Sequence, residues 1–310
     1  MKIGIDIGGT KCAVVLGDES GIRKKIRFAT TGKEETLERI LKAAGEIGGA
    51  DAVGISCGGP LDDEKGLILS PPNLPGWDRI PIVRMVEQAL GVPAYLCNDA
   101  NACALAEWKY GAGRGTKNMV FLTFGTGLGA GLILDGRLYT GTNGMAGEVG
   151  HLRLSEFGPV GYGKCGSFEG FCSGGGLAQI GKLLALEERQ AGRTVSFCSG
   201  AEGGDGITAK RLAEAADAGD AVARNAYRLS GEMLGRGLAV IVDLFNPECI
   251  VIGSIFARSE NLLREAMEDT LRREALSQAL AVCRIVPAAL GEEIGDYAAL
   301  AVALEKERKE

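Results

Sequence analysis

The stretch Asp6-Ile7-Gly8-Gly9-Thr10-Lys11 follows an apolar run at residues 3–5 and leads into a second apolar run at 13–16. A second stretch, Thr123-Phe124-Gly125-Thr126-Gly127-Leu128-Gly129, stands between apolar runs at 119–122 and 130–134. In both places the second run ends at a turn signal, after which a further strand is expected. Two strand–turn–strand units of the same design predict one half-domain that is used twice.

The glycines of these turns suit a backbone that approaches phosphate groups closely. Glycine has no Cβ to block the approach, so backbone N–H groups can reach phosphate oxygens. Thr10 in the first turn and Thr126 in the second each add a hydroxyl donor. The chain contains no GxxxxGK[ST] P-loop. The pair of turns therefore predicts a clamp that grips one nucleotide polyphosphate from two sides.

Composition and charge describe a protein of the cytoplasm with small-molecule ligands. The 310 residues are enough for two domains with full cores. A formal net charge of -6 argues against a nucleic-acid partner, because phosphate backbones require a basic surface. The nine cysteines are scattered and odd in number, which indicates reduced thiols. Asp6 interrupts the first apolar run, so we expect no signal peptide, and the most apolar later stretch, 238–256, carries charges that exclude a membrane span.

The order of elements predicts an α/β protein. In the first part we expect strands at 2–7, 12–16, 22–29, 53–56 and 94–97, and helices at 35–47, 81–89 and 99–110. Residues 113–116 are the expected interdomain hinge, and residues 141–176 form an irregular glycine-rich region. In the last part we expect helices at 175–190, 208–217, 221–244, 260–274 and 295–307, with strands at 249–252 and 282–286.

Four motifs in this order resemble the ROK family, which contains bacterial sugar kinases, glucokinases among them, and sugar-responsive repressors. They are Asp6 to Lys11, Asn98-Asp99, Gly125 to Gly129, and Glu148-Val149-Gly150-His151. The resemblance covers essentially the whole chain and implies the actin-like ATPase (ribonuclease H-like) fold, two α/β domains around a central cleft. It implies an N-terminal domain at 1–115, onto which a C-terminal helix at 295–310 packs back, and a larger domain at 116–294. It also implies ATP and Mg²⁺ as cofactors and a hexose as acceptor.

Asp99 is the predicted catalytic base. It follows the strand at 94–97, at the carboxyl edge where α/β sheets place ligands, and it opens a helix whose N-terminus favours the ionised carboxylate. Phosphoryl transfer depends more on positioning and charge than on a strong base, which suits such a group. The residues alone leave plain helix capping by Asn98-Asp99 as an equal alternative. The resemblance favours catalysis.

The nucleotide site is predicted from the resemblance together with the two turns. Asp6 would hold Mg²⁺ through water, as this hard cation prefers, although a turn aspartate that accepts glycine N–H groups is an alternative. Gly253, in a turn after the strand at 249–252, would contact the adenosine. The phosphate contacts would come from Gly8, Gly9, Thr10, Lys11, Thr126 and Gly127.

The resemblance also assigns the sugar-binding residues. Glu148, His151 and Glu169 match positions that bind the C1 and C2 hydroxyls, and Gly59, Asn98 and Asp99 would hold the opposite end of the ring. Charged partners bind vicinal hydroxyls strongly, because these groups both donate and accept. His151 is the only histidine in the chain, and a structural role is the alternative reading. The segment 70–77 resembles a loop at the pocket entrance, with Trp77 either lining it or simply packing.

Members of the ROK family usually carry a zinc knuckle, CxCGxxGCxE, whose three cysteines bind structural zinc together with the histidine. This chain departs from that pattern. Counting back from Glu169, the three cysteine positions are Val160, Tyr162 and Ser167. Cys165 and Cys172 do not have knuckle spacing, so we predict no structural zinc. A rebuilt site that uses His151 with these two cysteines is the rival reading. Because the altered loop at 158–173 carries Glu169, substrate identity is less constrained than reaction type.

The prediction is an ATP-dependent hexose kinase that acts as a homodimer, with glucose as the first substrate choice. An N-acetylated or amino hexose comes next, followed by fructose or allose. A sugar-sensing repressor would need a helix-turn-helix domain ahead of this core, and the first predicted strand begins at Lys2. A binding protein that has lost catalysis is the third reading, and the presence of Asp99 argues against it.

Overall fold

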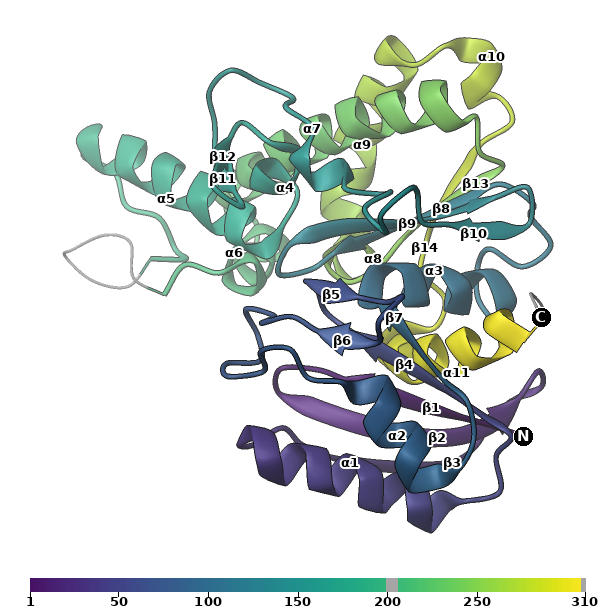
Figure 1. Ribbon diagram of the computed structural model, residues 1–310. Helices are drawn as coiled ribbons and strands as arrows, with labels where there is room; N and C mark the ends of the chain where they lie inside the picture. The colour runs from purple at the N-terminus through teal and green to yellow at the C-terminus, as the bar shows by residue number, and fades with distance from the viewer. Residues whose placement is uncertain (199–205, 308–310) are drawn as a thin grey trace. The chain divides into compact units, whose positions relative to one another are not determined.

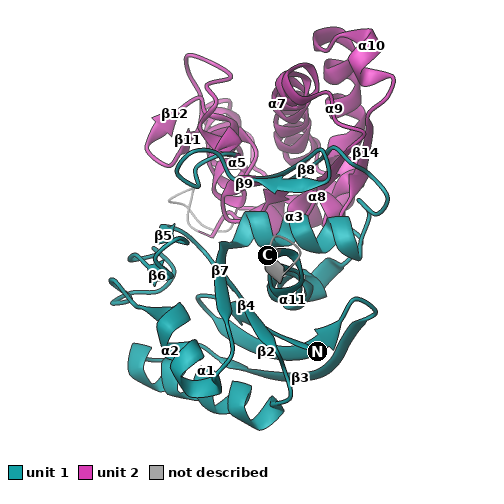
Figure 2. Ribbon diagram, turned by 45° about the vertical axis from the view of Figure 1, so that its right-hand side comes forward, with its two compact units in different colours: residues 1–121, 131–146, 289–310 teal, residues 122–130, 147–288 magenta. Residues whose placement is uncertain are grey.

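The computed structural model describes residues 1–198 and 206–307, with side chains described up to residue 305. The last three residues of the predicted segment 295–310 therefore lie outside the described residues. The chain divides into two compact units (Figure 2). Unit 1 contains Met1–Phe121, Gly131–Ala146 and Ala289–Glu310, and unit 2 contains Leu122–Ala130 and Gly147–Ala288.

Unit 1 is built on a five-stranded mixed sheet of order β3-β2-β1-β4-β7 (Figure 1). β1 pairs antiparallel with β2, and β2 pairs antiparallel with β3. β1 and β7 run parallel to β4 on its two sides. The five strands predicted for this part of the chain are confirmed, with bounds at β1 Lys2–Ile7, β2 Lys11–Asp18, β3 Gly21–Ala29, β4 Ala52–Cys57 and β7 Ala94–Asn98.

Helices cover both faces of this sheet (Figure 1). The helices on one face are α1 (Lys33–Ile47) and α2 (Ile82–Leu90). Their buried side chains belong to the same hydrophobic core as Ile3, Ile5 and Ile7 of β1. α11 (Ile294–Glu307) lies on the other face, where β1 and β4 present glycines: a Cβ on Gly4 or Gly54 would lie 2.5 or 2.2 Å from the α11 backbone. α3 (Asp99–Lys109) packs beside α11. The minor elements of unit 1 are β5 Leu61–Asp62, β6 Leu67–Ile68, β10 Arg137–Tyr139 and η2 Gly291–Glu293.

A second five-stranded sheet has the order β10-β9-β8-β13-β14, and the division between the units passes through β8 and β9. The strands are β8 Met119–Phe124, β9 Leu128–Leu134, β13 Cys249–Ile252 and β14 Arg284–Pro287. β13 matches its prediction residue for residue. β14 begins two residues later than the predicted 282–286, because Cys283 still belongs to a turn in which its N–H donates to the Leu280 carbonyl.

The helices predicted for unit 2 are confirmed, and the two longest pack closely. A Cβ on Gly231 or Gly235 of α7 would lie 2.7 or 2.4 Å from carbonyl oxygens of α9, so glycine permits this close approach. The principal helices are α5 Gly174–Gln190, α6 Ala209–Asp217, α7 Ala221–Phe245 and α9 Glu260–Glu274. The short elements are η1 Val149–His151, β11 Val160–Gly161, β12 Lys164–Cys165, α4 Phe168–Phe171, α8 Ile255–Arg258 and α10 Ser277–Leu280. None of the described helices combines the length and apolarity needed to cross a membrane.

Candidate active site

The predicted site residues of unit 1 lie together at one edge of its sheet. β1, β4 and β7 are parallel, with Ile7 opposite Cys57 and Cys57 opposite Asn98, so all three strands end at the same edge. A Cβ on Gly58 would lie 3.7 Å from Oδ2 of Asp99. A Cβ on Gly59 would lie 3.4 Å from Nδ2 of Asn98. The carboxyl edge of an α/β sheet is the usual place for a ligand, and here it carries carboxylates beside bare backbone.

Asp99 is the first residue of α3, and Asn98 is its N-cap. The N–H of Ala100 donates to Oδ1 of Asn98 at 3.0 Å and to Oδ1 of Asp99 at 2.8 Å. The capping alternative is therefore realised by Asn98, which satisfies a donor of the first turn. The second carboxylate oxygen of Asp99 is the atom nearest to Gly58. The hydrogen bond from Ala100 holds the Asp99 carboxylate in one orientation at the helix N-terminus.

Asp6 stands at the same edge in an acidic environment. The pKa of Asp6 is raised to about 6, chiefly by burial and then by the carboxylates of Asp296 and Asp99, while Lys11 and Arg27 lower it by less. Asp6 and Asp99 repel each other at this partly buried edge, and a divalent cation would neutralise both carboxylates. Asp6 thus fits a role in holding Mg²⁺. No group of three or more His, Cys, Asp or Glu side chains placed to hold a metal occurs within residues 1–198 and 206–307.

Asp296 is a buried neighbour of Asp6 that was not among the predicted site residues. It is 2% exposed, pairs with Lys25, and lies 3.4 Å from the Arg27 guanidinium. The neighbouring residue makes direct contact with Asp6, since a Cβ on Gly295 would lie 2.5 Å from its Oδ2. The sequence did contain a signal: Asp296 stands at the start of a largely apolar closing helix. A charge that is buried with such a helix needs charged or polar partners.

The first glycine turn is tight and exposed at its tip. The N–H of Gly8 donates to the Lys11 carbonyl at 3.1 Å, which closes the hairpin between β1 and β2. A Cβ on Gly9 would lie 2.5 Å from the carbonyl oxygen of Asn73, so only glycine fits beneath that loop. Gly9, Thr10 and Lys11 are exposed and available to a ligand. In the same loop, Trp77 is fully buried and therefore packs in the core.

The second glycine turn lies in unit 2, beside the predicted adenosine turn. The Gly125 carbonyl accepts a hydrogen bond from the N–H of Gly174 at 2.8 Å, and a Cβ on Gly125 would lie 3.3 Å from Oγ of Ser254. The N–H of Gly253 donates to the Leu122 carbonyl at 2.9 Å. Ser254 has a φ of 59°, a strained conformation for a residue with a side chain. Thr126, at the tip of the second turn, is exposed.

Glu169 connects the second glycine turn with the predicted sugar-binding segment. Its Oε2 accepts a hydrogen bond from the N–H of Leu128 at 3.0 Å, and a Cβ on Gly127 would lie 2.7 Å from the same oxygen. A Cβ on Gly150 would lie 3.4 Å from the Cβ of Glu169. The structure therefore brings Glu169 next to the segment that carries Glu148 and His151, whose side chains are exposed.

The loop in place of the zinc knuckle is held by protein contacts. Val160 pairs with Gln179, the Tyr162 ring meets the His151 ring edge-on at 5.3 Å, and Oγ of Ser167 accepts from the N–H of Gly170 at 3.1 Å. Cys172 is buried, its thiol lies 3.5 Å from the Ser230 carbonyl, and burial raises the pKa of that thiol. A protonated, buried thiol is a poor metal ligand.

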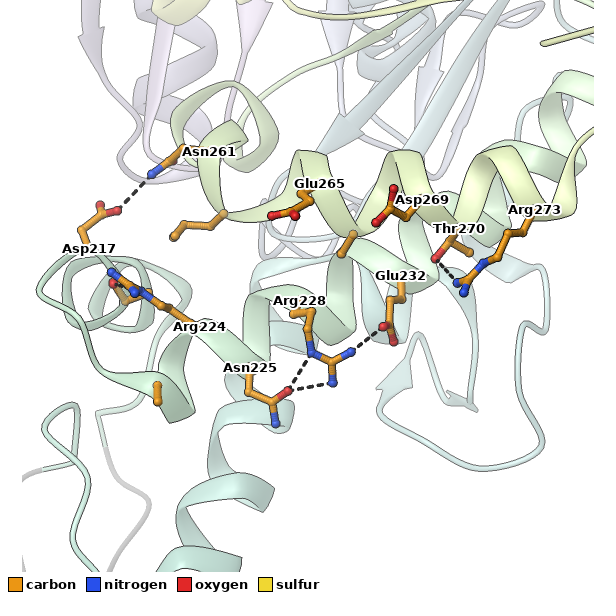
Figure 3. A pocket seen from close by; sticks show the side chains of 14 residues that line it. Asp217, Arg224, Asn225, Arg228, Glu232, Asn261, Glu265, Asp269, Thr270 and Arg273 are labelled. Carbon is orange, nitrogen blue, oxygen red and sulfur yellow. Dashed lines mark hydrogen bonds and ion pairs between the residues drawn. The ribbon is translucent and has the colours of Figure 1, made fainter.

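A large cavity lies elsewhere in unit 2 (Figure 3). Its volume is about 1020 Å³, and it is bordered by α6, α7 and α9. Its lining includes none of the predicted site residues. Arg228 pairs with Glu232 and with Asn225, and Asn261 donates to Asp217 at 3.1 Å. These five polar side chains of the cavity are therefore engaged with one another.

Comparison with known proteins identifies the family. The model of the ROK family matches residues 2–306. The chain belongs to the ROK family. This ROK protein is α/β with two mixed five-stranded sheets, the actin-like ATPase fold of ROK hexokinases.

Its relatives include several kinds of sugar kinase. It is 33% identical over 303 residues to a glucokinase of Streptomyces coelicolor, covering 95% of each chain. It is 32% identical over 269 residues to an N-acetylmannosamine kinase of Salmonella typhi, covering 85% of this chain and 86% of the relative. A ROK glucokinase from Streptomyces griseus, solved with glucose and AMPPNP, matches with a TM-score of 0.78 and 33% identity over 98% of this chain and 99% of that one.

Proposed function

We propose that this ROK protein transfers the γ-phosphoryl group of ATP to a hydroxyl of a hexose, with glucose as the preferred acceptor. The observation that carries the proposal is the carboxyl edge of the first sheet, where Asp6 near the end of β1 and Asp99 just after β7 stand on the two sides of β4, which Gly58 and Gly59 follow. The glucokinase relatives support glucose as the first choice. The two exposed glycine turns supply the phosphate contacts that such a reaction needs.

Asp99 accepts the proton of the attacking hydroxyl in this proposal. The transition state is loose, so the base must be ionised and well placed more than it must be strong. Its place at the start of α3 meets both needs. The N–H of Ala100 fixes Oδ1 of Asp99, and Oδ2 then lies on the side of Gly58. Asn98 and Gly59 bind the sugar at the end that Asp99 contacts, opposite the C1 and C2 hydroxyls.

ATP and Mg²⁺ are the proposed cofactors. Mg²⁺ supplies charge neutralisation at the phosphates, and Asp6 holds it through water. The first turn contributes Gly8, Gly9, Thr10 and Lys11. In unit 2, Thr126 and Gly127 take the phosphates and Gly253 takes the adenosine, which agrees with the adjacency of Gly125 and Ser254.

Glu148, His151 and Glu169 bind the remaining sugar hydroxyls. The contact between Gly150 and Glu169 supports this assignment, since Glu169 lies next to the segment that carries Glu148 and His151. Carboxylates accept from hydroxyls and an imidazole can either donate or accept, so together they can recognise a vicinal diol.

A coupled kinase assay across a panel of sugars tests the proposal. ADP production is measured with glucose, N-acetylmannosamine, N-acetylglucosamine, glucosamine, fructose and allose at matched concentrations. We expect the highest kcat/KM for glucose, with no turnover in the absence of Mg²⁺. Turnover with none of the sugars would leave a sugar-sensing protein without catalysis as the better reading.

An N-acetylated hexose is the second candidate. The N-acetylmannosamine kinase relative is nearly as similar as the glucokinase, and the loop at 158–173 that carries Glu169 departs from the family pattern. A kcat/KM for N-acetylmannosamine at least about tenfold above that for glucose would select this candidate.

We propose that the enzyme works as a homodimer in the cytoplasm. All nine cysteines are free, which suits a reducing compartment. Size-exclusion chromatography with light scattering measures the mass directly. A single peak at the mass of one chain would contradict the dimer.

A further inference from the structure

One hairpin touches both His151 and Glu169. The hairpin of β11 and β12 pairs Val160 with Cys165 and Gly161 with Lys164. At its tip, the Tyr162 ring lies edge-on against the His151 ring at 5.3 Å. Nζ of Lys164 donates to the His151 carbonyl at 2.6 Å. The hairpin therefore restrains both the ring and the backbone of this histidine.

The other strand of the hairpin packs against the backbone that carries Glu169. A Cβ on Gly161 would lie 2.8 Å from the Cβ of Glu169 and 2.5 Å from the nitrogen of Gly170. A Cβ on Gly170 would likewise lie 2.3 Å from the Pro159 carbonyl oxygen. Only glycine fits at these two positions, so the backbone of β11 lies directly against the backbone that carries Glu169, and we expect a shift of β11 to displace Glu169.

The hairpin is too short to be rigid by itself. Each strand has two residues, and an isolated two-stranded hairpin is marginally stable in water. Tyr162 at its tip is 77% exposed and has a φ of 44°. The hairpin must therefore take its position from a neighbouring rigid element.

Gln179 anchors β11 from α5, while the Arg153 guanidinium donates to the Cys165 carbonyl of β12 at 2.7 Å. Oε1 of Gln179 accepts from the N–H of Val160 at 2.9 Å, and its Nε2 donates to the Val160 carbonyl at 2.9 Å. One amide side chain thus satisfies both backbone groups of one strand residue, as a neighbouring β-strand would. α5 has 17 residues and begins at a serine cap, so it provides a firm base.

We propose that Gln179 is a positioning residue that sets the sugar site through the β11–β12 hairpin. The inference rests on the proposed function, in that Glu169 and His151 bind the sugar. Gln179 touches neither the sugar nor the nucleotide in this account. Its loss frees the hairpin and so weakens sugar binding, while the base and the phosphate turns stay in place.

Steady-state kinetics on four variants test this. Gln179→Leu removes both hydrogen bonds, and Gln179→Glu keeps the acceptor but turns a carboxylate oxygen toward the Val160 carbonyl. Gln190→Leu, an exposed residue at the end of the same helix, is the matched control. Glu169→Gln reports on the sugar site itself. Hydrogen exchange of the Val160 amide shows directly whether the clamp is lost.

Both Gln179 variants should raise the sugar KM about five- to tenfold, with kcat and the ATP KM within about twofold of the parent. The Val160 amide should exchange faster, and Gln190→Leu should behave as the parent. If Gln179→Leu fails to fold, Gln179→Glu carries the test. An unchanged sugar KM in the Gln179 variants, with Glu169→Gln raising it, would overturn this inference alone. An unchanged KM in Glu169→Gln as well would overturn the sugar-site assignment and the inference with it.

Discussion

The carboxyl edge of the first sheet and the loop around Glu169 hold their proposed functional groups by different means. At the sheet edge, Asp6 and Asn98 end strands whose neighbours are paired along their full length. In the loop, Glu169 lies against a two-residue strand whose Val160 is held by side-chain hydrogen bonds from Gln179. Backbone ladders distribute strain over many bonds, whereas the loop concentrates it in a few side-chain contacts.

The difference suggests a division of labour. The proposed phosphoryl transfer is assigned to the sheet edge, where the positions of Asp6 and Asp99 follow from the parallel register of β1, β4 and β7. The proposed sugar recognition is assigned to the loop, where single side chains can change without disturbing the hydrogen bonds of a sheet. The sheet edge should therefore show large effects on turnover and stability, and the loop should show smaller effects confined to sugar affinity.

The largest expected effect comes from Asp99→Asn. We predict that kcat falls at least about 100-fold while the KM values for sugar and ATP stay within about threefold, because the amide keeps the position but cannot accept the proton. Steady-state kinetics with a coupled assay measure this, and circular dichroism checks the fold. Near-normal turnover would remove Asp99 from the mechanism and leave it as a helix-capping neighbour.

Removing the buried carboxylate of Glu107 tests the rigidity of unit 1. Glu107 is 0% exposed and accepts backbone N–H groups from Ala112 at 2.7 Å, Ala289 at 3.2 Å and Leu290 at 2.9 Å. In Glu107→Gln, the amide NH₂ must face one of these donors, which leaves groups unsatisfied. We predict a loss of about 2–4 kcal/mol in the free energy of unfolding, measured by urea denaturation.

Glu46→Gln is the control for that experiment. Glu46 is exposed on α1, where its pair with Lys42 spans 3.9 Å, so its loss should cost less than about 0.5 kcal/mol. Equal effects of the two substitutions would show that Glu107 does not brace this region.

Asp6→Asn should give a pH-dependent gain in stability. The pKa of Asp6 is raised from 3.8 to about 6, chiefly by burial. The folded state therefore binds more protons than the unfolded state between these values, so the native protein loses stability as pH rises through this window. The variant escapes this loss, which is on the order of 2–3 kcal/mol. We expect the Tm of Asp6→Asn to exceed that of the parent at pH 7.5 but not at pH 4.5, without Mg²⁺ or nucleotide.

Asp51→Asn provides the contrast for Asp6→Asn. Asp51 is exposed and pairs with Lys2 at 2.9 Å, and that partner lowers its pKa. Its Tm difference from the parent should not change between pH 5.5 and 7.5. A Tm difference between Asp6→Asn and the parent that stays constant from pH 4.5 to 7.5 would mean that the pKa of Asp6 is not raised in the folded protein.

Chelation should have the smallest effect. Val160, Tyr162 and Ser167 stand where the resemblance places thiolates, and the loop is held by hydrogen bonds instead. We predict no stoichiometric zinc by elemental analysis and unchanged activity after EDTA dialysis once Mg²⁺ is restored. About one zinc per chain that resists the chelator would show that a metal holds the loop. The contrast between a sheet edge held by strands and a loop held by side-chain hydrogen bonds would then be wrong.

Much of the fold followed from local pattern. The strand at 2–7 and the helix at 260–274 have the predicted bounds, because a short apolar run and amphipathic periodicity are properties of neighbouring residues. Asn98 was a recognisable helix cap, and its bond to Ala100 confirms it. The start of β14 was missed, since the turn at Cys283 depends on a short helix that carries no strong periodicity.

The sequence by itself determined the two glycine turns, the order of strands and helices, and the types of residue that end the strands. These depend on sterics and hydrophobic periodicity over a few residues. Only the tertiary structure decided that Asp296 lies buried beside Asp6, that Glu107 accepts N–H groups from Ala289 and Leu290, and that Gln179 grips Val160. Such pairs join residues 19 to about 290 positions apart, and no local pattern specifies which distant partner a buried charge or a short strand will find.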